Sequence, residues 1–165
     1  VVTRVEVKVG IGDYAVAKKT GIISTYGLGS CVGITLYDRL NRVGGLLHAL
    51  LPESARYGGR GNPAKYVDTG LELLIKDMMK LGASPRRLEA KLFGGAHMFT
   101  NVSNENLMVG KKNVEVAKRE LKKRGIRLVA EDTGGKGGRT IYLDVSTGKV
   151  RMRKVSNGKV IEAVF

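Results

Sequence analysis

The side chains best suited to covalent or acid–base chemistry in this sequence are one cysteine and two histidines. Cys31 follows the segment Gly-Leu-Gly-Ser, which favours a tight turn where backbone N–H groups converge beside a side chain. A cysteine thiolate attacks carbonyl carbons, and a nearby imidazole is a common base for the thiol proton. Cys31 is therefore a candidate nucleophile, and His48 is a candidate base.

A β-hairpin would bring these two residues together. Apolar runs at residues 32–38 and 43–51 flank a short polar turn, a pattern that predicts two paired strands. If Asp38 pairs with Val43, His48 lies opposite Gly33, and Cys31 is its diagonal neighbour on the same face. A slip of one residue would put them on opposite faces, because side chains alternate along a strand.

Structural roles compete with this chemical interpretation. A lone cysteine in an apolar strand is usually a small buried hydrophobic residue, and a buried histidine is often a hydrogen-bonded core residue. His97, which follows Gly94-Gly95-Ala96, is a second candidate base. The same glycines permit close backbone approach, and we expect them to pack against the Cys31 loop.

Four separated segments carry a family resemblance: GLGSCVGITLYD, GGLLHALLP, KLFGGAHMF and VGKKNVEVAKREL. They resemble, in the same order, the CheD family of bacterial and archaeal chemoreceptor glutamine deamidases. That family is in turn similar in catalytic arrangement to the cytotoxic necrotizing factor toxins. The resemblance extends from about Val9 to Asp144.

The resemblance implies a cysteine hydrolase that converts glutamine side chains of chemoreceptor cytoplasmic helices to glutamate and releases ammonia. The family nucleophile matches Cys31, its general base matches His48, and its supporting threonine matches Thr25. The reaction would proceed through a thioester on the cysteine. The resemblance also implies binding to the chemotaxis phosphatase CheC, and a noncatalytic adaptor of that phosphatase is an alternative function.

Other parts of the site are expected from position alone. The backbone N–H groups of Ser30 and Cys31 are candidate oxyanion donors. The polar, glycine-rich loop at residues 53–61 directly follows the His48 strand, so Tyr57 and Arg60 are candidate substrate contacts. We expect no metal and no cofactor.

Charge and length bound the remaining possibilities. The net charge is +14, and residues 108–165 hold 15 basic and 6 acidic side chains. Such a surface favours an acidic partner, although a solvated, thermophile-like surface explains it equally well. A nucleic-acid module is a rival function, but the chain has only nine aromatic residues and no zinc pattern, so we expect no nucleic-acid partner. A lone cysteine and the lack of a long apolar run favour a cytoplasmic protein without membrane insertion.

The pattern along the chain predicts an α+β fold, with antiparallel or mixed sheet layers and two main helices packed on them. We expect residues 1–165 to form a single domain. One helix would open at Asn62-Pro63 and end at Gly82, and the second would span residues 111–124. A polar loop is expected at residues 100–108. Strands are predicted at residues 3–9, 13–18, 21–25, 32–38, 43–51, 88–93, 126–131, 139–145, 150–155 and 160–165.

Overall fold

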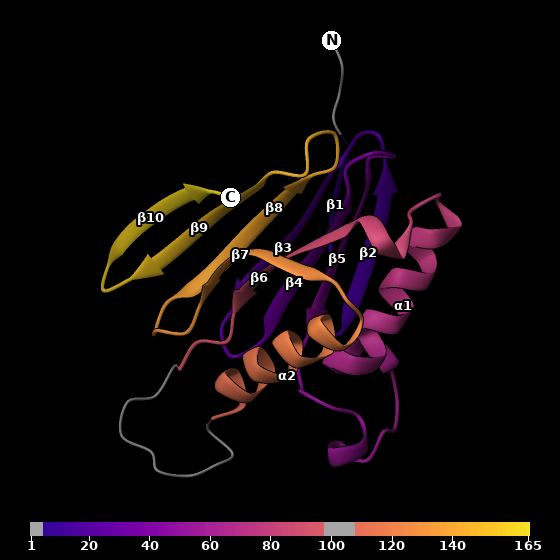
Figure 1. The fold of residues 1–165 in the computed structure, drawn as a ribbon. Helices are drawn as coiled ribbons and strands as arrows, with labels where there is room; N and C mark the ends of the chain where they lie inside the picture. Colours follow the sequence, from indigo (N-terminus) through magenta and orange to yellow (C-terminus); the bar gives the residue numbers. More distant parts are fainter. Residues whose placement is uncertain (1–4, 98–107) are drawn as a thin grey trace.

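The computed structural model describes residues 5–97 and 108–165. Within them, ten strands form two five-stranded sheets, and two α-helices cover one of the sheets (Figure 1). The fold class is α+β with mixed sheets, as the sequence predicted. Two predicted segments lie partly outside the described residues, namely residues 3 and 4 of the first strand and residues 100–107 of the polar loop.

The sheet without helices, which we call the outer sheet, has the strand order β1-β3-β8-β9-β10. Its β1 and β3 are parallel, and its other neighbours are antiparallel. The predicted last strand forms as β10, although its side chains Val160, Ile161 and Val164 remain largely exposed. The bounds are β1 (Glu6–Lys8), β3 (Ile22–Leu28), β8 (Gly138–Asp144), β9 (Val150–Ser156) and β10 (Lys159–Val164).

The second sheet, which we call the central sheet, lies between the outer sheet and the helices (Figure 1). Its order is β2-β5-β4-β6-β7, and only β6 and β7 are parallel. Every residue of β4 and β5 is buried, because other layers cover both faces, and this explains their nearly continuous apolar sequence. The bounds are β2 (Asp13–Lys18), β4 (Val32–Asp38), β5 (Val43–Ala49), β6 (Leu88–Gly94) and β7 (Arg127–Thr133).

The predicted hairpin is confirmed. Residues 32–38 form β4, and the second strand begins at Val43 but ends at Ala49, two residues earlier than expected. Asp38 pairs with Val43 and Gly33 pairs with His48, which is the register on which the Cys31 and His48 prediction depends.

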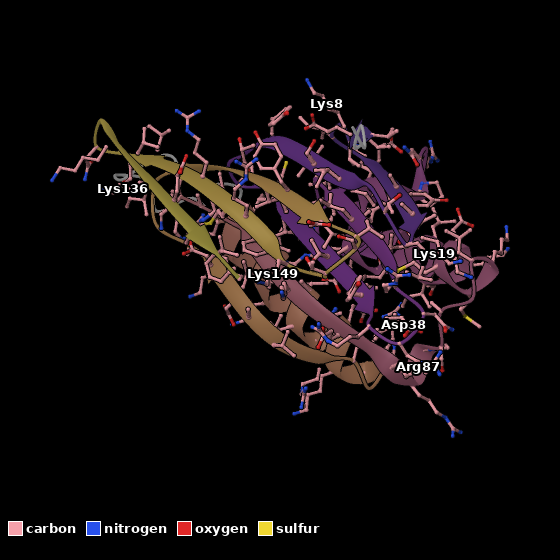
Figure 2. All side chains as sticks on the ribbon, turned by 90° about the horizontal axis from the view of Figure 1, so that it is seen from above. Lys8, Lys19, Asp38, Arg87, Lys136 and Lys149 are labelled. Carbon is pink, nitrogen blue, oxygen red and sulfur yellow. The ribbon has the colours of Figure 1, made fainter. Side chains whose placement is uncertain are left out.

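A buried carboxylate fixes the turn of this hairpin. Asp38 is fully buried and accepts hydrogen bonds from the Ser84 backbone N–H (2.9 Å) and the Arg87 guanidinium (3.0 Å) (Figure 2). Burial alone would raise the pKa of Asp38, but these hydrogen bonds, with one from the Asn41 backbone, hold it below its ordinary value. The turn between β4 and β5 is thereby tied to the segment that leads into β6.

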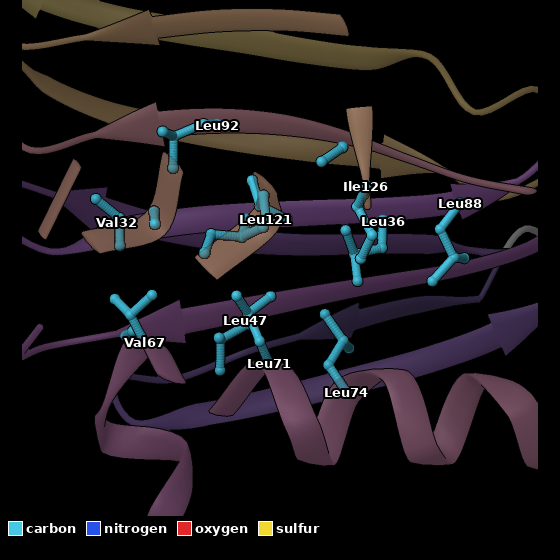
Figure 3. Close-up of a cluster of buried hydrophobic side chains, with 14 of the residues drawn as sticks. Val32, Leu36, Leu47, Val67, Leu71, Leu74, Leu88, Leu92, Leu121 and Ile126 are labelled. Carbon is cyan, nitrogen blue, oxygen red and sulfur yellow. The ribbon is translucent and has the colours of Figure 1, made fainter. Parts of the chain in front are cut away.

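Helix α1 (Val67–Lys80) packs an apolar stripe on the central sheet. The predicted stripe residues Val67, Leu71, Leu74 and Met78 are fully buried there. Gly82, with φ of 101°, follows the last turn and ends the helix, as predicted. Figure 3 shows Leu71 and Leu74 between helix α1 and the strands of the central sheet.

The predicted start of this helix was wrong. Asn62-Pro63 opens a short 3-10 turn, Pro63–Lys65, and the α-helix begins only at Val67. The Lys65 carbonyl accepts hydrogen bonds from the N–H groups of Leu50 and Leu51, at 2.9 and 3.0 Å. Tyr66 is extended there, so pairing with the chain beyond β5 delays the helix by one turn.

Helix α2 (Val109–Lys123) starts two residues before its predicted bound and lies across β4, β6 and β7. Its Leu121 joins Leu36 and Ile126 in the same buried cluster as the leucines of α1 (Figure 3). Neither described α-helix is long and apolar enough to span a membrane. The helices and the central sheet therefore share one core, and a second core lies between the two sheets.

Candidate active site

Cys31 lies in the turn between β3 and β4, at the edge of the core between the two sheets. Cys31 is 7% exposed and belongs to the buried cluster that contains Leu28, Phe93 and Ile141. Gly27, with φ of 68°, lies where the pairing of β3 with β8 is interrupted between Thr25 and Leu28, just before the turn. The thiol is thus nearly buried, but it lies where two strands end.

The glycine segment after β6 packs directly on this turn, as the sequence predicted. The Gly95 N–H donates to the Cys31 carbonyl and the Ala96 N–H donates to the Gly29 carbonyl, both at 2.9 Å. A Cβ atom on Gly94 would overlap the Cys31 carbonyl oxygen, and Gly94 has φ of 104°. Only a glycine allows the two backbones to approach this closely.

His48 lies near the end of β5 and faces the outer sheet. Its Nδ1 atom is 2.6 Å from the Thr25 hydroxyl oxygen in β3. That hydroxyl donates its only hydrogen to the Val9 carbonyl at 2.7 Å, so it must accept from His48 Nδ1–H. The proton is thereby placed on Nδ1, and Nε2 is left with a free lone pair.

The environment keeps this histidine neutral. His48 is 1% exposed, and its Nε2 atom has no hydrogen-bond partner among the described residues. Burial lowers the pKa of His48 from 6.5 to about 4. An imidazole with an unprotonated Nε2 can accept a proton at neutral pH, which is what a general base requires.

Cys31 is on the same side of the central sheet as His48. Gly33, directly opposite His48, faces the outer sheet, since a Cβ atom there would lie 2.9 Å from side-chain carbons of Leu28 and Ile141. Cys31 packs in the same space between the sheets. Burial raises the pKa of the Cys31 thiol, and its own backbone N–H opposes that shift. The resting pair is therefore a neutral thiol and a neutral imidazole, so the thiol must lose a proton to attack.

Two residues that sequence reasoning missed hold the cysteine turn in place. Asn113 of α2 is fully buried and bonds to the backbone of the turn. Arg139, 2% exposed, donates to the Gly134 carbonyl and to Asp132, both at 2.9 Å, behind the glycine segment. Each has a sequence signal: Asn113 interrupts the apolar stripe of its helix, and Arg139 occupies an inward position of a strand.

The other predicted site residues are distributed around this centre. Apart from the Cys31 sulfur itself, no described residue accepts a hydrogen bond from the backbone N–H of Ser30 or Cys31. His97 donates its backbone N–H to the Gly135 carbonyl at 2.7 Å, whereas Thr25 orients the ring of His48. The assignment of the base to His48 stays a prediction.

The loop that carries Tyr57 and Arg60 lies against the helices. Glu53 accepts from Arg119 of α2 at 2.6 Å, and the Ser54 N–H donates to Asp68 of α1 at 3.0 Å. A substrate contact by Tyr57 or Arg60 stays a prediction. Residues 5–97 and 108–165 contain no group of three or more histidine, cysteine or acidic side chains that could hold a metal.

Cys31 and the buried imidazole of His48 thus lie on the same side of the central sheet, and a thiol and an imidazole are two of the groups that cysteine hydrolases use. The family model described as CheD chemotactic sensory transduction matches residues 50–154. A protein of Pyrococcus horikoshii, named probable chemoreceptor glutamine deamidase CheD, is 80% identical over 160 residues, which are 97% of this chain and 99% of its own. The chain belongs to the CheD family.

More distant relatives are also named chemoreceptor glutamine deamidase CheD, and they align with this chain over most of their length. A Thermotoga maritima protein, named chemoreceptor glutamine deamidase CheD, is 44% identical over 93% of this chain and 95% of its own. A Caldanaerobacter subterraneus protein, named probable chemoreceptor glutamine deamidase CheD, is 47% identical over 92% of this chain and 94% of its own. The family-model match begins after His48, but these longer similarities extend over nearly the whole chain.

Proposed function

We propose that this protein is a protein-glutamine deamidase that converts glutamine side chains of chemoreceptor cytoplasmic helices to glutamate. The hydrogen bond from His48 to Thr25 carries the proposal, because it leaves Nε2 free to take the thiol proton of Cys31. The names of relatives that align over almost the whole chain supply the substrate class.

The reaction has two halves. His48 takes the proton of the Cys31 thiol, the sulfur attacks the carboxamide carbon, and the C–N bond breaks. His48 returns the proton to the departing nitrogen, so ammonia leaves and a thioester remains. Water then gives a proton to His48 and attacks the thioester, which releases glutamate and restores the thiol.

The backbone N–H groups of Ser30 and Cys31 are suited to the negative oxygen that forms in each half. Both belong to the turn that carries the sulfur, and apart from that sulfur no described residue accepts a hydrogen bond from either. Preorganised donors of this kind stabilise a tetrahedral intermediate without reorganisation during the reaction. Thr25 keeps the imidazole in the correct tautomer, the role of the orienting group in a triad.

Mass spectrometry of a chemoreceptor cytoplasmic fragment tests the proposal. Incubation with the wild-type protein should raise the mass of glutamine-containing peptides by about one dalton per converted side chain, as replacement of an amide by an acid requires. Cys31→Ala and Cys31→Ser should both be inactive, with unchanged circular dichroism, because a buried sulfur contributes little to the fold compared with its role as nucleophile. Equal conversion by wild type and Cys31→Ala would exclude a cysteine mechanism.

The family resemblance also supports a second function, binding to the phosphatase CheC, and action in the cytoplasm where both partners would meet. Isothermal titration of CheC with the purified protein measures that binding directly. Cys31→Ala should bind CheC as wild type does, since its change is confined to one nearly buried atom. If no heat of binding is measured at high micromolar concentration, the proposed CheC-binding function is rejected.

A further inference from the structure

One buried amide of α2 connects the cysteine turn to the histidine strand. Asn113 Nδ2 donates to the Ser30 carbonyl at 2.9 Å and to the Leu50 carbonyl at 3.0 Å. These two acceptors fix the orientation of the amide, because the reversed amide would place its oxygen against two carbonyl oxygens. Leu50 lies just beyond β5, two residues after His48.

The first of these bonds controls the direction of a candidate oxyanion donor. The Ser30 carbonyl and the Cys31 N–H belong to one peptide group, and in a trans peptide they point in opposite directions. Drawing the Ser30 carbonyl toward α2 therefore aims the Cys31 N–H away from the helix. That N–H also opposes the rise that burial causes in the pKa of the Cys31 thiol, so it lies close to the sulfur.

The second bond ties the same amide to the strand that carries His48. The β4 and β5 pairing ends at Val32 and Ala49, so no strand pairing holds the two chains together beside Cys31. Asn113 bridges the carbonyls of Ser30, two residues before that end, and Leu50, one residue after it. A side chain from a third element therefore joins the cysteine turn to the strand that carries His48.

Asn113 is a poor choice for stability alone. Its Oδ1 atom is buried without a hydrogen-bond partner among the described residues. Neighbours on the same face of α2, such as Val116, Ala117 and Leu121, are apolar and buried. An acceptor buried without a partner destabilises a protein, so stability does not explain an asparagine at this position.

We propose that Asn113 is a positioning residue for the reaction at Cys31, and this inference rests on the proposed function. It holds the Cys31 N–H toward the place where the oxyanion forms and keeps the cysteine turn in register with His48. Loss of the amide leaves the two carbonyls unbridged, so the geometry of the transition state is lost more than the binding of substrate.

The test compares Asn113→Ala and Asn113→Ser with Leu121→Ala, a buried change on the same helix that does not touch the turn. Two measurements are made on each protein: the rate of Cys31 alkylation by iodoacetamide as a function of pH, and kcat and KM on a chemoreceptor fragment. In Asn113→Ala we expect at least a tenfold lower kcat, a KM within twofold of wild type and an alkylation profile moved to higher pH. Asn113→Ser, whose hydroxyl can bridge to one carbonyl only, should be intermediate.

Leu121→Ala should keep the wild-type kcat and alkylation profile while lowering the melting temperature. Matching profiles in Asn113→Ala and wild type, or an equal loss of kcat in Leu121→Ala, would overturn the proposal. If neither Asn113 variant folds, the residue is needed for folding, and the proposed positioning role is overturned as well. If no protein in the series converts glutamine but the alkylation profiles differ as expected, the proposed substrate is wrong and the positioning role stands.

Discussion

The hydroxyl of Thr25 has a single hydrogen, and the Val9 carbonyl accepts it. This one donation determines the tautomer of a histidine on another strand, because the hydroxyl can then only accept from His48 Nδ1. In the proposed site, a neutral hydroxyl takes the place that a carboxylate has in a Ser-His-Asp triad. A neutral orienting group leaves the imidazole without a stabilising negative charge, which accords with its lowered pKa.

Thr25→Val keeps the side-chain shape and removes the hydroxyl. We expect a loss of about 100-fold in kcat, within the range attributed to a positioned general base, because the imidazole can then adopt the wrong tautomer. Thr25→Ser, which retains the oxygen, should lose much less. Steady-state kinetics on a receptor fragment measures both, and equal activity of the valine and serine variants would refute the role of the hydroxyl.

His48 also makes stability depend on pH. Its pKa is about 4 in the fold and 6.5 for the ordinary side chain, so below pH 6.5 the unfolded chain binds a proton that the folded protein does not. The free energy of unfolding should therefore fall as pH decreases from 6.5 to 4, by about 3 kcal/mol from this residue. The effect is absent above pH 6.5, where His48 is neutral in both states.

Urea denaturation of wild type and His48→Gln at several pH values measures this contribution. The glutamine variant should lose that part of the pH dependence, whereas His97→Gln should retain it. A wild-type slope between pH 6.5 and 4 that His48→Gln leaves unchanged would mean that other groups cause it. The experiment needs no substrate, so it tests the buried neutral histidine separately from the proposed activity.

At the scale of elements, three turns interlock around the thiol. The segment after β6 bonds to the cysteine turn through Gly95 and Ala96, and the Gly134 N–H after β7 donates to the Gly94 carbonyl at 2.9 Å. The cysteine turn joins β3 to β4 and the Gly134 turn joins β7 to β8, so strands of both sheets contribute to the position of Cys31. Glycines occupy positions 94 and 95 because a Cβ atom at either position would overlap neighbouring atoms.

Gly94→Ala tests the interlock. The added Cβ would overlap the Cys31 carbonyl oxygen, and the backbone must shift because neither group is flexible. We expect a large loss of kcat and a destabilisation beyond the roughly 1 to 2 kcal/mol that a positive φ costs an alanine. Gly125→Ala is the matched control, since Gly125 has φ of 70° with open space around it. Equal effects of the two variants on kcat would contradict a specific role for Gly94.

At the scale of the whole molecule, the net charge is +14, and only some of the basic side chains of α2 form ion pairs. Lys118 pairs with Glu131 at 3.0 Å and Arg119 with Glu53 at 2.6 Å, so part of the basic surface of α2 is already engaged. Lys122 and Lys123 are exposed in the last turn of the same helix. A field of this kind accelerates encounter with an acidic partner and is screened by salt over roughly 8 Å.

Reversing Lys122 and Lys123 to Glu should lower kcat/KM several-fold at low salt and leave kcat within twofold, since these residues act on encounter and not on chemistry. Lys159→Glu, on the outer sheet, changes the charge without changing α2 and serves as control. Raising the salt concentration should reduce the difference between wild type and the double variant. If the double variant keeps the wild-type kcat/KM at low salt, this end of α2 does not face the receptor.

Much of the architecture followed from local pattern in the sequence. The alternating and apolar runs identified the strands, and the apolar stripes with Gly82 and Gly125 beyond them identified both helices. The register of β4 and β5 followed from the length of the polar turn between them. That register placed Cys31 and His48 on one face, because the side-chain period of a strand is fixed by its backbone. The division into a single domain stays a prediction.

Other features depended on contacts between residues far apart in the chain. The start of α1 moved to Val67 because the Lys65 carbonyl bonds to Leu50 and Leu51, which no local propensity could indicate. The sheet order, and hence the layer that buries His48, was decided by tertiary packing. The sequence by itself determined which residues could react. The tertiary structure decided their protonation and orientation, since burial lowers the pKa of His48, the Thr25 hydroxyl sets its tautomer and the Asn113 amide bridges to the cysteine turn.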